Sequence, residues 1–154
     1  ADRGVDIFTL GGTKNGLMFG EALVPLRPEL AKNIRYYRKQ STQVYSKMRY
    51  IAAQFIPYLN EGLWIENARK SNDAARQLFD EMSRVKEVQF TQPVQSNALF
   101  FILPREVAAK LRARYFFYDW NESTGEARIV CSWDTSMEDI ERFTGYLKAL
   151  VSDS

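Results

Sequence analysis

DIFTLGGTKNGLMFGEALV, residues 6–24, contains two short apolar runs separated by a glycine-rich connector. Residues 5–10 are rich in types that favour strands, and residues 19–24 form a second run of this kind. The connector reads Gly11-Gly12-Thr13-Lys14-Asn15-Gly16, and glycines at this density are typical of a tight return. We therefore predict an antiparallel strand pair that presents Lys14 on its connector.

Helices are expected after this strand pair. Pro28 suits the first turn of a helix that runs to about Gln40. Apolar residues at steps of three and four then predict two further helices, and Pro57 is expected to kink or end the first of them. The apolar faces contain Val44, Met48, Ile51, Phe55 and Leu59 in one helix, and Trp64, Ala68, Ser71, Ala75, Leu78 and Met82 in the next.

The second half of the chain changes to the shorter period of strands. Strands are predicted at residues 88–91 and 98–103. An aromatic strand at 115–120 and a returning strand at 128–133 flank the turn residues 121–125, which predicts a hairpin. Helices that cover one face of an antiparallel sheet are the architecture favoured by this order.

Two helices complete the second half. Pro104 is expected to start a short helix that ends near Arg112. Thr135 and Glu138 have the spacing of a capping box at the start of the last helix. The buried face of that helix is predicted to contain Ile140, Phe143, Leu147 and Leu150.

The composition excludes several kinds of chemistry. The 154 residues contain no histidine and one cysteine, Cys131, so this chain alone forms no Ser-His-Asp triad, no histidine metal site and no internal disulfide. We expect no bound metal. The longest apolar run, residues 98–103, is too short to cross a bilayer, so we expect no membrane partner. A single cysteine is compatible with the cytoplasm, where we expect the protein to lie.

Charged residues leave two interpretations open. Lys14 is either a presented nucleophile or an exposed turn lysine, and the order of residues required for a phosphate-binding P-loop is absent. Between Arg27 and Arg49 there are seven basic residues and one acid, a local charge of 7 − 1 = +6. This charge indicates either solvated helix faces or a phosphate or carboxylate partner.

Three blocks of the sequence resemble the threonine aldolase and β-eliminating lyase family, in the same order. Residues 6–24 look like the family's pyridoxal-phosphate lysine segment. Residues 46–54, Ser-Lys-Met-Arg-Tyr-Ile-Ala-Ala-Gln, are similar to the helix that follows in its low-specificity aldolase branch. Residues 128–135, Arg-Ile-Val-Cys-Ser-Trp-Asp-Thr, followed by Glu138-Asp139, are similar to the C-terminal strand and helix start. The resemblance covers nearly the whole chain.

The resemblance implies the C-terminal part of a pyridoxal-phosphate enzyme with the aspartate-aminotransferase fold. Such enzymes are α/β proteins whose small α+β domain has an antiparallel sheet covered by helices. Residues 1–40 would be the end of the large cofactor-binding domain, and residues 41–154 the small domain with bridging helices. The family's ring partner, its aspartate for the pyridine nitrogen and most of its phosphate site match nothing here. We therefore expect the isolated 154-residue chain to be inactive.

The family's functional residues carry over to three positions. Lys14 matches the Schiff-base lysine, and Arg128 matches the arginine that binds the substrate α-carboxylate. Arg49 matches an arginine that reaches toward the cofactor phosphate or a neighbouring subunit's site. The residues alone allow plainer interpretations: an exposed turn lysine, a surface-paired strand arginine and a solvated helix residue. Lys39 lies near a position that is basic in the family. The spacing of residues around it differs from that in the commoner, glycine-rich form of this family segment, so Lys39 is not assigned a role.

The implied activity is pyridoxal-phosphate-dependent cleavage of threonine-like β-hydroxy amino acids to glycine and an aldehyde. An amino-acid substrate and a homodimer or homotetramer are implied with it. One alternative is a non-catalytic fragment or interaction domain. A weaker one is a single-stranded nucleic-acid module whose aromatic run, residues 115–120, stacks on bases. Alternate rings of a strand point to opposite faces, so the core explains half of this run and we expect no nucleic-acid partner.

Overall fold

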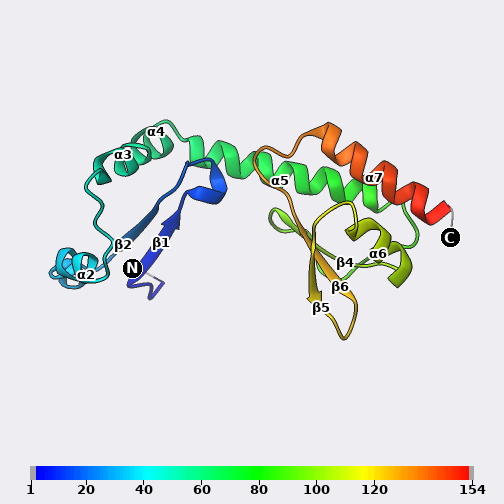
Figure 1. Cartoon of the computed structure of the whole chain (residues 1–154), viewed down its shortest axis with the longest axis horizontal. Helices are drawn as coiled ribbons and strands as arrows, with labels where there is room; N and C mark the ends of the chain where they lie inside the picture. Colours follow the sequence, from blue (N-terminus) through cyan, green and yellow to red (C-terminus); the bar gives the residue numbers. More distant parts are fainter. Residues whose placement is uncertain (1–2, 153–154) are drawn as a thin grey trace. The chain divides into compact units, whose positions relative to one another are not determined.

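The computed structural model describes residues 3–152, which divide into two compact units between Glu66 and Asn67 (Figure 1). The division lies inside helix α5 (Leu63–Met82). The border predicted between residues 40 and 41 concerns the large and small domains of an enzyme, and it stays a prediction. The two units are described in turn.

The first unit contains a strand hairpin followed by short helices. The hairpin pairs β1 with β2 in antiparallel register, with Ile7 opposite Pro25 and Gly11 opposite Glu21, which confirms the predicted strand pair. The elements are β1 (Ile7–Gly11), the 3₁₀ helix η1 (Thr13–Asn15), β2 (Glu21–Pro25), α1 (Pro28–Ala31), α2 (Ile34–Gln40), α3 (Met48–Ala53) and α4 (Phe55–Asn60).

Two helices predicted in this unit are each broken in two. The predicted helix from Pro28 to Gln40 is interrupted at Asn33, a residue type that favours helix starts over helix interiors. The predicted helix with the apolar face from Val44 to Leu59 is divided into α3 and α4. Pro57 explains this second break, because a proline ring clashes with the carbonyl four residues earlier, at Ala53, where α3 ends.

Helix α2 ends at a left-handed residue that is not glycine. Thr42 has a φ of 58°. The Thr42 N–H donates to the Lys39 carbonyl at 3.1 Å, and the Gln43 N–H donates to the Arg38 carbonyl at 3.0 Å. These are the two hydrogen bonds of a Schellman motif, in which the left-handed position strongly favours glycine. A β-branched residue is strained in this conformation.

The second unit is a four-stranded antiparallel sheet with helices on one face. Its strand order is β3-β4-β6-β5, and the predicted order of strands and helices is confirmed. Strand β3 is shorter than predicted, and β5 begins later. Besides the C-terminal part of α5, the elements are β3 (Gln89–Phe90), β4 (Ala98–Ile102), α6 (Arg105–Arg112), β5 (Tyr118–Asn121), β6 (Glu126–Val130) and α7 (Met137–Ser152).

The core of this unit lies between the helices and one face of the sheet (Figure 1). Leu99 and Phe101 of β4 and Ala127 of β6 are buried in it. Side chains alternate between the faces of a strand, so Phe100 and Arg128 lie on the opposite face, directly across from one another. The helices contribute Ala74, Ala75, Leu78 and Met82 from α5, Val107 and Leu111 from α6, and Ile140, Phe143 and Leu147 from α7.

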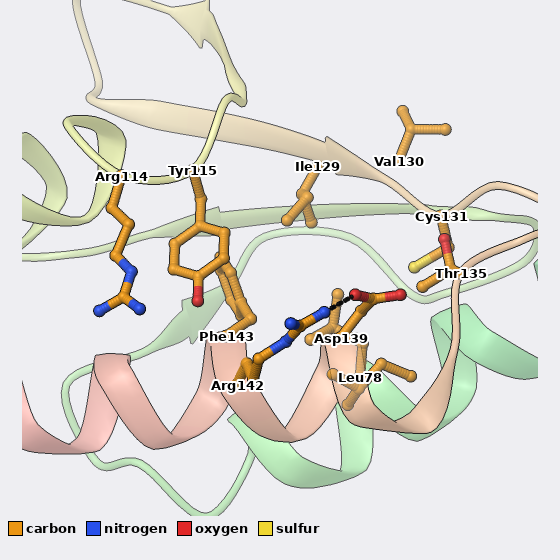
Figure 2. A pocket seen from close by; sticks show the side chains of 11 residues that line it. Leu78, Arg114, Tyr115, Ile129, Val130, Cys131, Thr135, Asp139, Arg142 and Phe143 are labelled. Carbon is orange, nitrogen blue, oxygen red and sulfur yellow. Dashed lines mark hydrogen bonds and ion pairs between the residues drawn. The ribbon is translucent and has the colours of Figure 1, made fainter.

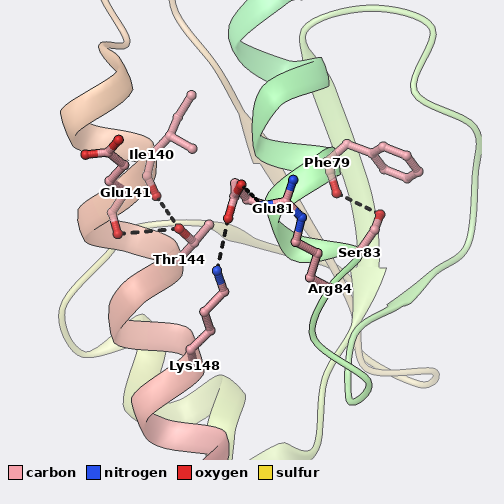
Figure 3. A network of polar contacts seen from close by, with 8 residues as sticks. All are labelled: Phe79, Glu81, Ser83, Arg84, Ile140, Glu141, Thr144 and Lys148. Carbon is pink, nitrogen blue, oxygen red and sulfur yellow. Dashed lines mark hydrogen bonds and ion pairs between the residues drawn. The ribbon is translucent and has the colours of Figure 1, made fainter.

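Polar contacts join α5 to α7 at the edge of this core (Figure 3). Lys148 Nζ lies 3.0 Å from Glu81 Oε2, and Glu81 also pairs with Arg84. The hydrogen bond from Lys148 is the largest of the contributions that lower the pKa of Glu81. Thr144 is buried between the helices, and its hydroxyl donates to the Ile140 carbonyl of the same helix at 2.8 Å. The buried hydroxyl is therefore satisfied within α7.

A capping box starts α7, one residue later than predicted. The Ser136 Oγ accepts the Asp139 N–H at 3.1 Å, and the Asp139 Oδ2 accepts the Ser136 N–H at 3.0 Å. The prediction of Thr135 and Glu138 was wrong because the Thr135 Oγ1 instead accepts the Ser132 N–H at 2.8 Å, in the preceding turn. Hydrogen bonds from Ser136, and then Arg142, lower the pKa of Asp139 to about 2.

We expect Asp139→Asn to remove an acid-dependent part of the stability of the second unit. The folded-state pKa of Asp139 is depressed below its ordinary value of 3.8. Its contribution to the free energy of unfolding is therefore present above about pH 4 and is lost as the pH falls toward about 2. Urea midpoints measured across this range should converge for wild type and Asp139→Asn at the acid end. Glu122→Gln, an exposed change in the β5–β6 turn, is the control. A constant difference between wild type and Asp139→Asn would contradict this origin.

Candidate functional site

Lys14 lies on η1, between β1 and β2, with an exposed side chain. Backbone hydrogen bonds close the turn around it. The Asn15 and Leu17 N–H groups donate to the Gly12 carbonyl at 2.9 and 3.0 Å. The Gly12 N–H donates to the Gly20 carbonyl at 3.2 Å, and the Gly20 N–H donates to Thr13 Oγ1 at 3.1 Å. The lysine therefore projects from a turn whose backbone is held on both sides.

Two glycines of this turn have structural reasons for their presence. A Cβ atom at Gly12 would lie 2.1 Å from Leu17 Cδ1, inside the space of a buried leucine. Gly16 ends η1 with a φ of 104°, a left-handed conformation that side chains disfavour. The turn that presents Lys14 thus requires glycine on either side of it.

Side chains from the short helices anchor the same turn. Asn15 Nδ2 donates to the hydroxyl of Tyr58 at 2.7 Å and to the Trp64 carbonyl at 3.0 Å, and Tyr58 is only 1% exposed. The Gln54 amide accepts the Met18 N–H at 2.9 Å. Sequence reasoning missed Tyr58 and Gln54 because no local pattern links residues that are 36 or more positions from their partners.

Arg49 lies in the first turn of α3 and is exposed. Its guanidinium carbon is 5.1 Å from the centre of the Tyr50 ring, and Nη2 donates to the Tyr50 hydroxyl at 3.4 Å. Within residues 3–152 no carboxylate pairs with it, and no hydrogen bond joins it to Lys14. Its cationic group is thus available to an anion.

Arg128 lies on β6 of the second unit, on the face opposite the helices. Its Nε atom is buried and has no hydrogen-bond partner. The part of the chain that the structure describes provides no acid or hydrogen-bond acceptor for the rest of the guanidinium either. The plainer interpretation, a strand arginine paired with a surface acid, is therefore not what the structure contains. Its guanidinium carbon instead lies 5.0 Å from the Trp120 ring centre and 5.9 Å from that of Phe100.

A separate cavity of about 390 Å³ lies between β6, α7 and the segment before β5 (Figure 2). None of the predicted site residues lines it. Its walls are mainly apolar, and an ion pair between Asp139 and Arg142 lies at one side. Burial raises the pKa of the Cys131 thiol in its wall to about 11. The lining also includes Leu78, Arg114, Tyr115, Ile129, Val130, Thr135, Ile140 and Phe143.

No family model matches this chain. Two curated enzymes, both low-specificity L-threonine aldolases, are similar to it in sequence. The Pseudomonas aeruginosa protein is 37% identical over 148 residues, which cover 96% of this chain and 43% of that protein. The protein of a Pseudomonas species is 31% identical over 149 residues, which cover 97% and 43%. The chain thus spans less than half the length of these relatives.

Solved structures give the same result. The threonine aldolase of Leishmania major matches with a TM-score of 0.86 and 32% identity, over 97% of this chain and 44% of that one. A glycine decarboxylase (P-protein) matches with a TM-score of 0.53 and 17% identity, a likeness of fold alone. The resemblance to the C-terminal part of threonine aldolases is confirmed, and so is the predicted pyridoxal-phosphate enzyme fold with an antiparallel sheet covered by helices.

We expect the Cys131 thiol to be unreactive in the folded chain. With a pKa of about 11, only about one molecule in a thousand carries the reactive thiolate near pH 8. A disulfide reagent added at that pH should react slowly with the native chain and rapidly after unfolding in urea, when the pKa returns to its ordinary value. Equal rates in the two states would mean that the thiol is not buried in solution.

Proposed function

We propose that this chain, a homologue of the C-terminal part of low-specificity L-threonine aldolases, forms part of a pyridoxal-phosphate-dependent carbon–carbon lyase. The reaction is the cleavage of a threonine-like β-hydroxy amino acid to glycine and an aldehyde. The single observation that carries the proposal is the half-buried Arg128 guanidinium, which has no acid partner among residues 3–152 of a chain with this homology. A guanidinium whose N–H groups have no acceptor in the protein is suited to bind a carboxylate through two parallel hydrogen bonds.

The first unit has a lysine and an arginine suited to the two reactive or charged groups of the cofactor, its aldehyde and its phosphate. Lys14 offers an exposed primary amine on a turn fixed by hydrogen bonds, and this amine would hold the cofactor covalently. Arg49, an exposed cation of the same unit with no carboxylate partner among residues 3–152, would hold the phosphate or reach a neighbouring subunit's site. When bound, pyridoxal phosphate supplies the electron sink that accepts the electron pair of the breaking Cα–Cβ bond.

Arg128 would bind and orient the substrate. Two parallel hydrogen bonds from a guanidinium hold a carboxylate in one plane, so they also restrict rotation of the attached Cα. Fixing the carboxylate selects which of the three bonds at Cα stands ready to break. In the lyase reaction this must be the Cα–Cβ bond. Arg128 therefore contributes affinity and orientation.

The first unit needs further polypeptide to complete the site and cover its apolar surface. Among its described residues, Leu17 and Tyr58 are the large apolar side chains that are buried, whereas Ile7, Phe8 and Leu23 of the hairpin are 40–53% exposed. An exposed apolar surface of this extent is typical of an interface. The covering polypeptide would be the region that the relatives have beyond the match, or another copy in a homodimer or homotetramer.

The same exposure favours a second candidate, that the chain by itself is a non-catalytic fragment. We also propose that the protein lies in the cytoplasm, with which its single cysteine is compatible. Within residues 3–152 no helix has both the length and the apolar character that a membrane span requires.

Stacking of the aromatic run, residues 115–120, on nucleic-acid bases has less support. Phe117 of this run lies in the core, and the Trp120 ring contacts the guanidinium of Arg128.

We expect Lys14 to be the cofactor's attachment point in the complete enzyme. Borohydride reduction with pyridoxal phosphate present, followed by peptide mapping, should place the label on Lys14. The label should be lost in Lys14→Ala and kept in Lys47→Ala, which changes another exposed lysine of the same unit. A label on any other side chain would remove Lys14 from this role. The isolated chain should give little near-visible absorbance with the cofactor, because most of the cofactor site is missing.

We expect Arg128→Ala mainly to weaken binding of the amino acid by the complete enzyme. A charge-assisted hydrogen-bonded pair contributes about 1.5–3 kcal/mol. Its loss corresponds to an increase of about ten- to a hundredfold in the apparent dissociation constant. Arg112→Ala is the control, because the Nη2 of Arg112 already pairs with Asp119 at 2.6 Å in the same unit. An unchanged affinity in Arg128→Ala would show that Arg128 does not bind the carboxylate.

A further inference from the structure

Three side chains from three adjacent strands meet on the helix-free face of the sheet. Arg128 of β6 lies directly opposite Phe100 of β4 in the strand register. Trp120 belongs to β5, on the other side of β6. The Phe100 and Trp120 rings contact each other edge to face, with centres 5.3 Å apart and planes at 73°. The guanidinium of Arg128 lies over both rings.

A second arginine of the same sheet unit shows what is unusual about this arrangement. Arg112 and Arg128 each have a buried Nε without a hydrogen bond, and each lies over an aromatic ring. Arg112 also has an acid, Asp119, which accepts a hydrogen bond from its Nη2. Arg128 has two rings and no acid among the described residues. Its environment therefore attracts the cation but does not satisfy its hydrogen-bond donors.

Aromatic rings hold a guanidinium differently from a carboxylate. The face of an aromatic ring attracts a cation through its quadrupole, but it carries no net charge and accepts no strong hydrogen bond. An acid in the same place would occupy the guanidinium and repel an incoming carboxylate. Contact with two adjacent rings also restricts the side-chain rotamers of the arginine before a ligand arrives, which lowers the entropy lost on binding.

We propose that Trp120, together with Phe100, is a positioning residue that holds the Arg128 guanidinium in place for the substrate carboxylate. The inference rests on the proposed function, because it assigns the free donors of Arg128 to the amino-acid substrate. Trp120 is the more accessible half of the pair for a test. Its ring is the closer one to the guanidinium, and it is 52% exposed on the edge strand β5, so its replacement leaves no cavity in the core.

The principal experiment compares steady-state kinetics of the complete, cofactor-loaded enzyme with Trp120→Leu and Trp120→Phe. A misplaced arginine weakens binding of the substrate carboxylate and loosens the orientation that Arg128 gives to Cα, so Trp120→Leu should raise KM for the amino acid about tenfold and lower kcat as well. Trp120→Phe keeps an aromatic face and should recover most of the affinity. Tyr118→Leu is the matched control. Tyr118 is also on β5 and pairs with Arg128 in register, but its ring packs edge to face on Phe116, and the cation–π contacts of Arg128 among the described residues are with Phe100 and Trp120.

A second measurement reports on the arginine directly, without turnover. In the enzyme labelled with ¹⁵N-arginine, the buried Nε–H of Arg128, identified by its absence in Arg128→Lys, should exchange slowly with water. Trp120→Leu should accelerate this exchange at least about tenfold, whereas Tyr118→Leu should leave it unchanged. A loss of fold would instead accelerate exchange throughout the protein.

The outcomes separate this proposal from the proposed function. If Arg128→Ala weakens binding but Trp120→Leu behaves like Tyr118→Leu in both measurements, the positioning role is wrong and the carboxylate role stands. If Arg128→Ala has no effect on affinity, the carboxylate role fails, and the positioning role fails with it. In the double variant, Trp120→Leu should add almost nothing to Arg128→Ala. A full additional loss would overturn the proposal, because Trp120 would then act without Arg128.

Discussion

The alternation of side chains along β6 is the constraint on which the candidate substrate site depends. Ala127 is buried against the helices, and the next residue, Arg128, is therefore carried to the opposite face. A shift of the strand register by one residue would place the guanidinium in the apolar core and an alanine on the open face. The core packing of Leu99 and Phe101 on the neighbouring strand holds the register, so the stability of the second unit and the placement of Arg128 have the same physical origin.

The first unit is held together in another way. It has almost no apolar core of its own, and the turn that carries Lys14 is fixed by backbone hydrogen bonds and by the side chains of Asn15 and Gln54. Polar contacts of this kind define a geometry well, but each contributes only about 1 kcal/mol to stability. The exposed apolar side chains of the hairpin are typical of an interface, and we propose that further polypeptide covers them. This agrees with a chain that spans less than half of its relatives.

Much of the element order could be predicted because it follows from local patterns. The Gly11–Gly16 connector between two apolar runs predicted the hairpin. The apolar spacing from Trp64 to Met82 predicted a helix face that is buried from Ser71 onward, whereas Trp64 is exposed. The errors also have local causes. Asn33 interrupts a helix that was expected to be continuous from Pro28 to Gln40, whereas the break expected from Pro57 is found. The Thr135 hydroxyl accepts the Ser132 N–H, so the capping box forms at Ser136 instead. Thr135 and Ser136 are adjacent and can each cap the start of a helix, so residue spacing alone does not show which of them does.

By itself, the sequence determined which residues could bear chemistry: one lysine between glycines, and an arginine inside a strand, in blocks that resemble a known family. Only the tertiary structure decided how those residues are held. Tyr58 lies 43 positions from Asn15, and yet its hydroxyl accepts the Asn15 hydrogen bond that helps to fix the lysine turn. Phe100 and Trp120 come from separate strands to contact Arg128. Sequence patterns report local geometry, whereas these contacts arise when distant segments are brought together by the burial of a common core.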